Sequence, residues 1–278
     1  MRMVLGTLAF PALALALAGC GAGGSSRDTV VAAFYPLAYA AEQVGGPTYG
    51  VLNLTPAGAE PHDIELAPQQ VAAIQRARVV LYLSHGFQPA VADALRGAQG
   101  RAIDVLAGIT LRPGDPHVWL DPVLYARIVR RIGSALGRPQ AAARLAMSVL
   151  ALDGAYRKGL AHCASREFVT THAAFGYLAA RYGLHQVSIT GIDPASEPAA
   201  QKLVALVQLV RRDHLKTIFF ERLVSPKLAQ TIAREAHVTT AVLDPIEGLT
   251  PSEAAHGATY LSLMRQNLRA LRSDLGCR

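Results

Sequence analysis

Three histidines and one aspartate have the residue types and the chain positions of a metal-binding site. His62, His117 and His172 each lie in a loop that follows a predicted strand, and Asp244 ends the last predicted strand. Ligands in open α/β sheets bind beyond the carboxyl ends of the strands, so these residues occupy the expected edge. Three imidazole nitrogens and one carboxylate oxygen suit Zn²⁺, which binds four such ligands at about 2.0–2.2 Å.

His117 lies in the stretch Asp115-Pro116-His117-Val118-Trp119-Leu120-Asp121-Pro122, which contains the only tryptophan of the chain. A proline disfavours the helical conformation in the residue before it, so Asp115 and Asp121 are expected to be extended. His117 therefore projects from a stiff loop, which is a suitable base for a metal ligand. A histidine considered alone is more often structural, and the hypothesis depends on the four residues together.

Acidic residues near these histidines are candidates for orienting the imidazole rings. A histidine must be neutral to bind a metal, and a carboxylate that pairs with one ring nitrogen leaves the other nitrogen for the ion. The candidates are Glu60, Asp63, Asp115, Asp121 and Glu221. His85 also follows a predicted strand and is a candidate auxiliary ligand.

The elements that must position these residues alternate between short β-branched runs and helical patterns, which is typical of parallel α/β folds. This predicts two lobes, residues 28–137 and residues 164–278, each a mainly parallel sheet flanked by helices, with the metal site in the cleft between them. The predicted strands are 30–34, 51–54, 79–83, 102–105, 168–171, 186–189, 217–220 and 241–243.

One long helix is predicted to connect the two lobes over residues 138–163. Its apolar residues Leu145, Val149, Leu152 and Tyr156 recur at helical spacing. At about 1.5 Å per residue the helix would extend roughly 30 Å, which is enough to join two lobes along one side. The tail from residue 251 to 272 also has one apolar face and is predicted as a single helix.

The N-terminus has the features of an export signal. Residues 1–19 combine Arg2 with a short apolar run, and Leu17-Ala18-Gly19-Cys20 resembles a bacterial lipobox. This predicts cleavage before Cys20, a lipid on its thiol, and a flexible tether over residues 20–27. A plain signal peptide with an incidental cysteine is the alternative. Either way, the protein is expected outside the cytoplasm.

The remaining composition bears on partners and on a disulfide. Hydrophobic residues make up 51% of the chain and charged residues 17%, which is ample for buried cores. The net charge is +7, but no basic cluster with interleaved aromatic residues is present, so nucleic-acid binding is not expected. In an oxidising compartment Cys163 and Cys277 are expected to form a disulfide, with two free thiols as the alternative.

Five segments together carry a family resemblance. They are Phe34-Tyr35-Pro36, Pro56-Ala57-Gly58-Ala59-Glu60-Pro61-His62-Asp63-Ile64-Glu65, the His117 stretch, Thr171-His172-Ala173-Ala174-Phe175-Gly176-Tyr177 and Leu243-Asp244-Pro245. The chain resembles the metal-binding lipoproteins of zinc and manganese ABC importers. The resemblance implies two lobes joined by one long helix, with His62, His117, His172 and Asp244 as ligands.

The resemblance also implies a function. An extracytoplasmic, lipid-anchored, monomeric receptor of this kind delivers its metal to a transmembrane permease with its ATPase. Manganese-type relatives have Glu where this chain has His172, so zinc is predicted, with a manganese or iron receptor as the alternative. Many zinc-binding members carry a histidine-rich loop before the second ligand, whereas residues 106–115 contain no histidine.

Two other function classes share some of these features. A zinc hydrolase would also use three histidines, but Asp244 would occupy the position that the catalytic water needs, and no HExxH motif is present. An adhesin is suggested by the association of the family with cell attachment, but nothing in the sequence marks such a surface. The expected protein is therefore a receptor rather than an enzyme.

Overall fold

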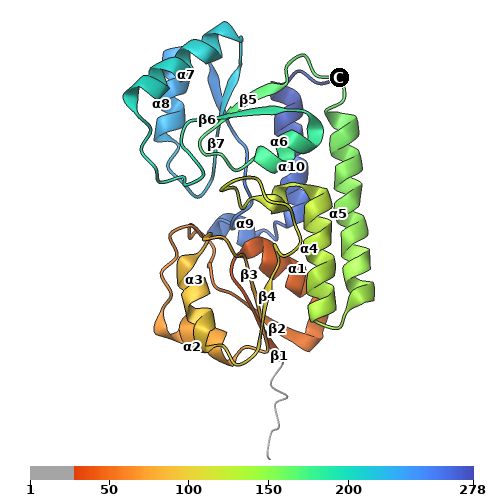
Figure 1. Cartoon of the computed structure of the whole chain (residues 1–278). Coiled ribbons are helices and arrows are strands. Elements are labelled where there is room, and N and C mark those ends of the chain that lie inside the picture. The colour runs from red at the N-terminus through yellow and green to blue at the C-terminus, as the bar shows by residue number, and fades with distance from the viewer. Residues whose placement is uncertain (1–27) are drawn as a thin grey trace, which may run out of the picture.

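The computed structural model describes residues 28–278, which form two lobes that each contain one sheet (Figure 1). The expected signal peptide, the lipidated Cys20 and the tether lie outside the described residues. Between residues 28 and 278, no helix combines the length and the apolar composition needed to cross a membrane.

The first lobe contains a four-stranded parallel sheet with the strand order β2-β1-β3-β4. Its strands are β1 (Asp28–Ala32), β2 (Tyr49–Asn53), β3 (Val79–Tyr82) and β4 (Arg101–Asp104). Its connecting helices are α1 (Tyr35–Gly45), α2 (Pro68–Arg76) and α3 (Pro89–Ala94), with 3-10 turns η1 (Gly46–Thr48) and η2 (Leu95–Gly97). Consecutive buried valines in β1 and β3 show that both faces of the central strands are covered.

The second lobe repeats this arrangement with the strand order β6-β5-β7-β8, again all parallel. Its strands are β5 (Glu167–Thr170), β6 (His185–Ser188), β7 (Thr217–Phe220) and β8 (Thr239–Val242). Its helices are α6 (Gly176–Tyr182), α7 (Ala200–Arg212) and α8 (Lys227–Ala236). The predicted fold class, two parallel sheets flanked by helices, is confirmed.

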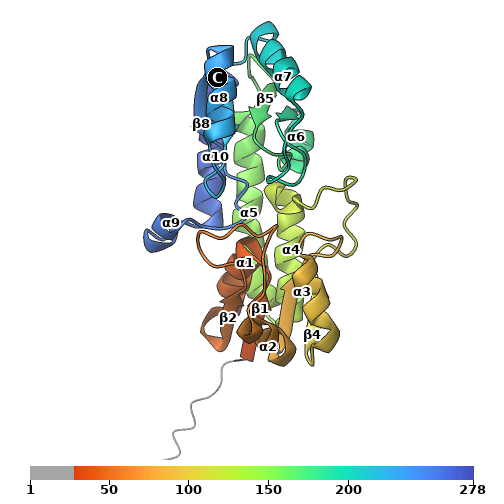
Figure 2. The same ribbon diagram turned by 90° about the vertical axis from the view of Figure 1, so that its left-hand side faces the viewer.

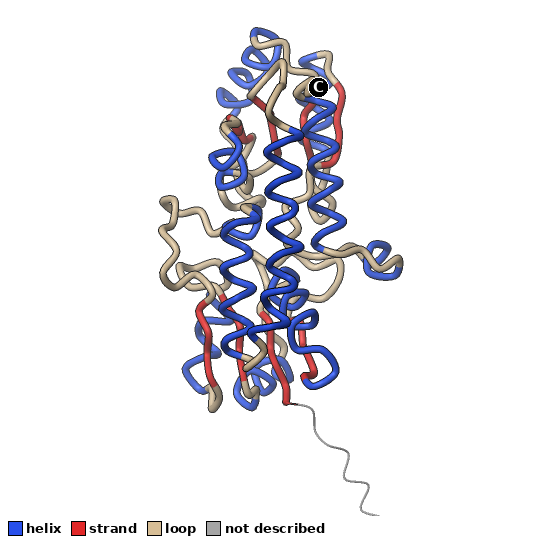
Figure 3. Tube along the Cα trace, turned by 90° about the vertical axis from the view of Figure 1, so that its right-hand side faces the viewer, coloured by secondary structure: helices blue, strands red, loops and turns tan. Residues whose placement is uncertain are grey.

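Two consecutive helices follow the first sheet: α4 (Pro122–Ala135) and α5 (Pro139–Gly159). Asp121 caps α4, accepting a hydrogen bond from the Val123 N–H at 2.8 Å. The 21 residues of α5 extend about 31 Å, alongside both sheets (Figures 1 and 3). Its predicted apolar face is buried, including Val149 and Tyr156.

The prediction of a single tail helix is wrong. The segment forms a short helix α9 (Pro251–Ala255), which projects from the body in Figure 2, and a longer helix α10 (Tyr260–Asp274). Gly257 adopts φ +68°, which ends the first helix, and the Thr259 side chain caps the second. Helix α10 packs against α5, where the buried Tyr156 hydroxyl donates to the Met264 carbonyl at 2.7 Å.

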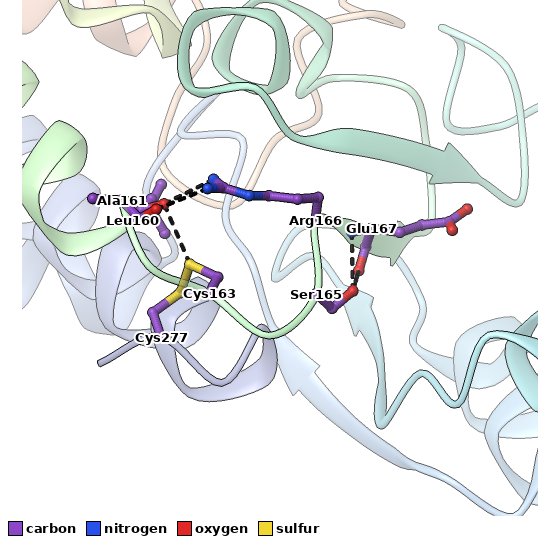
Figure 4. The surroundings of a disulfide bond; sticks show 7 residues. All are labelled: Leu160, Ala161, Cys163, Ser165, Arg166, Glu167 and Cys277. Atoms are coloured by element: carbon purple, nitrogen blue, oxygen red, sulfur yellow. Dashed lines mark hydrogen bonds between the residues drawn. A yellow bond between two sulfur atoms is a disulfide. The ribbon is translucent and has the colours of Figure 1, made fainter.

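A disulfide joins Cys163, which lies between α5 and β5, to Cys277, which follows α10 (Figure 4). The expected pairing is therefore confirmed. The bond spans a sequence separation of 114 residues and connects the start of the second lobe to the end of the chain. Nearby, the Arg166 guanidinium donates to the carbonyl oxygens of Leu160 and Ala161 (Figure 4).

Candidate metal centre

Four side chains from distant parts of the chain meet between the two lobes. They are His62, His117, His172 and Glu247, and one nitrogen or oxygen of each lies within 4.8 Å of the others. The side chains of His117, His172 and Glu247 are at most 1% exposed, and that of His62 is 10% exposed. The structure thus brings together the three histidines named from the sequence, with a glutamate as the fourth residue.

Each of the four residues follows the carboxyl end of a strand. His62 lies in the loop after β2, and His117 precedes the 3-10 turn η3 (Val118–Leu120) after β4. His172 follows β5, and Glu247 lies in the loop after β8. Because all strands of each sheet are parallel, these loops leave each sheet at one edge, and the two edges face each other across the group.

The donor atoms have the spacing of a tetrahedral zinc site. Glu247 Oε1 lies 2.9 Å from His117 Nε2, 3.3 Å from His62 Nε2 and 3.5 Å from His172 Nε2. The Nε2 atoms of His117 and His172 are 3.3 Å apart. Ligands at about 2.0–2.1 Å from a tetrahedral metal lie about 3.3–3.4 Å from one another. The residues present therefore fit Zn²⁺ without a large rearrangement.

The ring of His117 is oriented by Asp115. Asp115 Oδ1 lies 2.8 Å from His117 Nδ1 and also accepts the His117 backbone N–H at 2.9 Å. A neutral His117 that donates from Nδ1 to this carboxylate presents its Nε2 lone pair to the metal position. Gly176 permits the arrangement, because a Cβ at this position would lie 2.7 Å from Asp115 Oδ2.

The His172 ring forms an ion pair with Glu221, which follows β7. Glu221 Oε1 lies 2.7 Å from His172 Nδ1, accepts the His172 backbone N–H at 3.3 Å and accepts the Thr171 hydroxyl. Burial lowers the pKa of His172, but Glu221 and Glu247 outweigh this effect and raise it to about 10. In the metal-free protein this ring therefore holds a proton that zinc must displace.

His62 is held through its backbone and by ring packing. Glu60 Oε1 accepts the His62 backbone N–H at 3.2 Å, and the ring packs edge-on against Phe87 with centroids 4.7 Å apart. Burial and the neighbouring Glu247 raise the pKa of Glu60 to about 8. Glu60 thus lies beside the group and orients the main chain of His62 rather than its ring.

Glu247 is a buried carboxylate that lacks a full set of partners. Burial favours its neutral form, but hydrogen bonds from the three histidines hold its pKa well below the usual range. Its second oxygen, Oε2, is buried and has no hydrogen-bond partner among residues 28–278. A carboxylate that is ionised, buried and half satisfied is the environment that a bound cation stabilises.

The structure does not bring Asp244 into the group, which differs from the prediction. Asp244 Oδ1 accepts the Ile246 N–H at 2.7 Å, and Oδ2 lies 3.7 Å from Arg222 Nε. Burial raises the pKa of this carboxyl to about 7. Asp244 ends the strand as expected, but the chain then turns, and Glu247, three residues later, reaches the histidines.

The other candidates differ in their surroundings. Asp121 caps α4 and pairs with Arg181 at 2.7 Å, so it stabilises the helix and its neighbour rather than a histidine. Asp63 is exposed. His85 is exposed in a turn with φ +63° and is not part of the group. Of the named carboxylates, Asp115 and Glu221 are therefore the two that contact a ring nitrogen.

Glu247 was not predicted because Asp244 is the first carboxylate after the last strand. The signal was present, since Glu247 is a carboxylate in the short stretch Pro245-Ile246-Glu247-Gly248 directly after the last strand. A proline next to Asp244 and a glycine after Glu247 indicate a turn in which either acidic residue could face the histidines.

Replacing Glu221 with alanine is expected to lower zinc affinity by about 10–100-fold, because His172 loses the partner that orients its ring. Competition with a chromogenic chelator at fixed pH would measure the change. Glu235, an exposed glutamate on α8 of the same lobe, supplies the matched control, and Glu235→Ala should leave the affinity unchanged. Equal affinities for the Glu221→Ala and Glu235→Ala proteins would contradict this role.

The sequence matches a family model described as zinc-uptake complex component A, periplasmic, over residues 30–274. It is 36% identical to the zinc-binding lipoprotein AdcA of Streptococcus pneumoniae, in an alignment that covers 87% of the chain and 55% of the relative. The chain thus spans about half the length of the streptococcal relatives that it matches. It is 34% identical to the high-affinity zinc uptake system protein ZnuA of Bacillus subtilis, with 97% of both covered.

Solved structures show the same architecture. The Zn(II)-bound ZnuA-like domain of Streptococcus pneumoniae AdcA matches with a TM-score of 0.79 and 37% sequence identity. The match covers 90% of the chain and 99% of that domain. The two-lobe fold therefore has a counterpart among solved structures, and that protein was solved with Zn(II) bound.

Proposed function

Because the chain belongs to the zinc-uptake complex component A family, we propose that it is a receptor that binds one Zn²⁺ outside the cytoplasm. It delivers the ion to the permease of an ABC-type importer, and no covalent bond is made or broken in the process. His62, His117, His172 and Glu247 hold the metal.

The observation that supports this proposal is the convergence of three imidazole Nε2 atoms on one buried carboxylate oxygen at 2.9–3.5 Å. Three nitrogen donors favour Zn²⁺ over Mn²⁺, which prefers sites richer in oxygen. The protein supplies all four ligands, as in closed zinc sites, whereas a catalytic zinc keeps one position for water. The donor set therefore favours a carrier of zinc over a zinc hydrolase.

Capture and release require the buried site to open. Zinc displaces the protons that the histidines share with Glu247, so acidic conditions oppose binding. The long helix α5 lies alongside both lobes, and it restricts opening to small lobe or loop shifts rather than a wide hinge. Contact with the permease would supply such a shift.

The remaining assignments follow the same proposal. Residues 1–19 are a signal peptide, Cys20 carries a lipid, and residues 20–27 tether the monomeric protein to the outer face of the cell membrane. Residues 28–137 and 164–278 are the two lobes, joined by residues 138–163. The permease and its ATPase are the functional partners.

Native mass spectrometry combined with elemental analysis tests the proposal. Protein purified without chelator, then offered Zn²⁺, Mn²⁺ and Fe²⁺ at equal concentrations, should retain one zinc per chain. Protein stripped with chelator and left unloaded provides the metal-free reference mass. Retention of manganese or iron in place of zinc, or of no metal, would contradict the assignment.

A further inference from the structure

The turn that carries Glu247 to the histidines contains an unusual backbone conformation. Ile246 is fully buried and adopts φ +57°, in the left-handed region. A β-branched side chain is strained there, and such strain persists only where the surrounding structure holds it in place. The φ angle of Ile246 sets the direction in which the next residue, Glu247, leaves the turn.

Three side chains hold the turn by hydrogen bonds: Asn267, Trp119 and Asp244 itself. The Asn267 side chain on α10 accepts the Asp244 N–H at 2.9 Å and donates to the Asp244 carbonyl at 2.6 Å. The Trp119 indole N–H donates to the Pro245 carbonyl at 2.7 Å. Four consecutive backbone polar groups, from the Asp244 N–H to the Ile246 N–H, are therefore engaged by side chains.

The bond at Ile246 comes from Asp244 itself. Asp244 Oδ1 accepts the Ile246 N–H at 2.7 Å, which closes a turn between the aspartate and the residue two positions later. This is the contact that acts directly on the strained residue, since Asn267 and Trp119 bind the preceding groups. Arg222 lies on the other carboxylate oxygen of Asp244, at 3.7 Å.

We propose that Asp244 is a positioning residue for Glu247: its carboxylate holds Ile246 in the left-handed conformation that points the Glu247 carboxylate at the three histidines. This inference rests on the proposed function, because it assumes that Glu247 binds the zinc. It assigns to Asp244 a role through hydrogen bonding rather than through metal coordination.

If Asp244 acts by accepting a hydrogen bond, zinc affinity should depend on its acceptor oxygen and not on its negative charge. Asp244→Asn keeps an oxygen that accepts the Ile246 N–H, and zinc affinity should stay close to that of the parent protein. Asp244→Ala removes the acceptor, and affinity should fall about 10–100-fold, the range for residues that orient a ligand. Competition with a chromogenic chelator measures all of these affinities.

Two combined variants test whether Asp244 acts through the turn. In a Glu247→Gln background, Asp244→Ala should cause no further loss of affinity, because the group it positions no longer binds as a carboxylate. Combining Asp244→Ala with Ile246→Gly should restore part of the lost affinity, since glycine adopts positive φ without help. A general loss of stability would produce neither result.

Asp104 provides a matched control. It also ends a strand, β4, and its Oδ1 accepts the N–H of Leu106, two residues later, at 3.0 Å. No member of the histidine and glutamate group follows Asp104 within three residues. Asp104→Ala should therefore leave zinc affinity unchanged, and the visible spectrum of its Co²⁺ form should match the parent spectrum. The Co²⁺ spectrum of Asp244→Ala should instead resemble that of Glu247→Gln.

The outcomes separate this inference from the proposed function. If Glu247→Gln binds zinc as tightly as the parent protein, the proposed ligand set is wrong. If Glu247→Gln weakens binding but Asp244→Ala does not, the site stands and the positioning role is wrong. Equal losses in Asp244→Asn and Asp244→Ala would likewise overturn it, because they would indicate that the charge matters rather than the hydrogen bond.

Discussion

Replacing His117 with alanine is expected to lower zinc affinity by more than about 100-fold, beyond the range that changes around a ligand produce. His117 Nε2 is the histidine nitrogen nearest to Glu247 Oε1, at 2.9 Å, and its ring is fully buried. The variant removes one of four donors and also leaves the buried Asp115 carboxylate without its ring partner. Chelator competition, supported by calorimetry, would measure the loss.

The matched control for this experiment is His85→Ala. His85 belongs to the same lobe and also follows a strand, but it is exposed and lies outside the metal group. Its replacement should leave zinc binding unchanged. Circular dichroism of both variants without metal would verify that they fold. Unaltered zinc affinity in a folded His117→Ala protein would exclude His117 as a ligand.

Loss of the disulfide is expected to lower the free energy of unfolding by about 4–5 kcal/mol. In the chain-entropy model, a cross-link that closes a loop of about 100 residues stabilises the folded state by this amount, and Cys163 and Cys277 are separated by 114 residues. The double variant Cys163→Ser/Cys277→Ser should therefore unfold at a much lower urea concentration. Urea denaturation in the presence of chelator would measure the change without a contribution from bound metal.

Zinc affinity provides a second readout for the same variant. The disulfide links the segment between α5 and β5 to the end of the chain, whereas the metal group lies in the loops between the two sheets. Below the unfolding transition, the double variant should bind zinc like the parent protein. An unchanged urea midpoint would show that the disulfide adds no stability. Weakened zinc binding in the folded double variant would contradict the prediction that the metal group does not depend on the disulfide.

Much of the fold follows from local patterns. Short buried runs such as those of β1 and β3 predict strands, because parallel strands covered on both faces are apolar throughout. The apolar spacing of α5 predicted a long helix, and its face is buried as expected. The tail was predicted less well. Its apolar face begins only at Tyr260, and the positive φ of Gly257 divides the segment into α9 and α10.

The sequence by itself determined the three histidines and the elements that carry them. Each follows a strand, and in a parallel sheet the carboxyl ends of the strands lie at the same edge, so local reasoning placed each histidine at the ligand-binding edge of its own sheet. The Asp115-Pro116 pair likewise predicted a stiff loop around His117, and the structure adds the contact between the Asp115 carboxylate and the ring.

Only the tertiary structure decided which carboxylate joins the histidines. The choice between Asp244 and Glu247 depends on a turn in which Ile246 has positive φ, against its intrinsic preference. The backbone on either side of that turn is held by Asn267, 23 residues after Asp244, which binds Asp244, and by Trp119, 126 residues before Pro245, which binds Pro245. Because these contacts form only when α10 and the His117 loop pack against the end of β8, no local pattern could choose between Asp244 and Glu247.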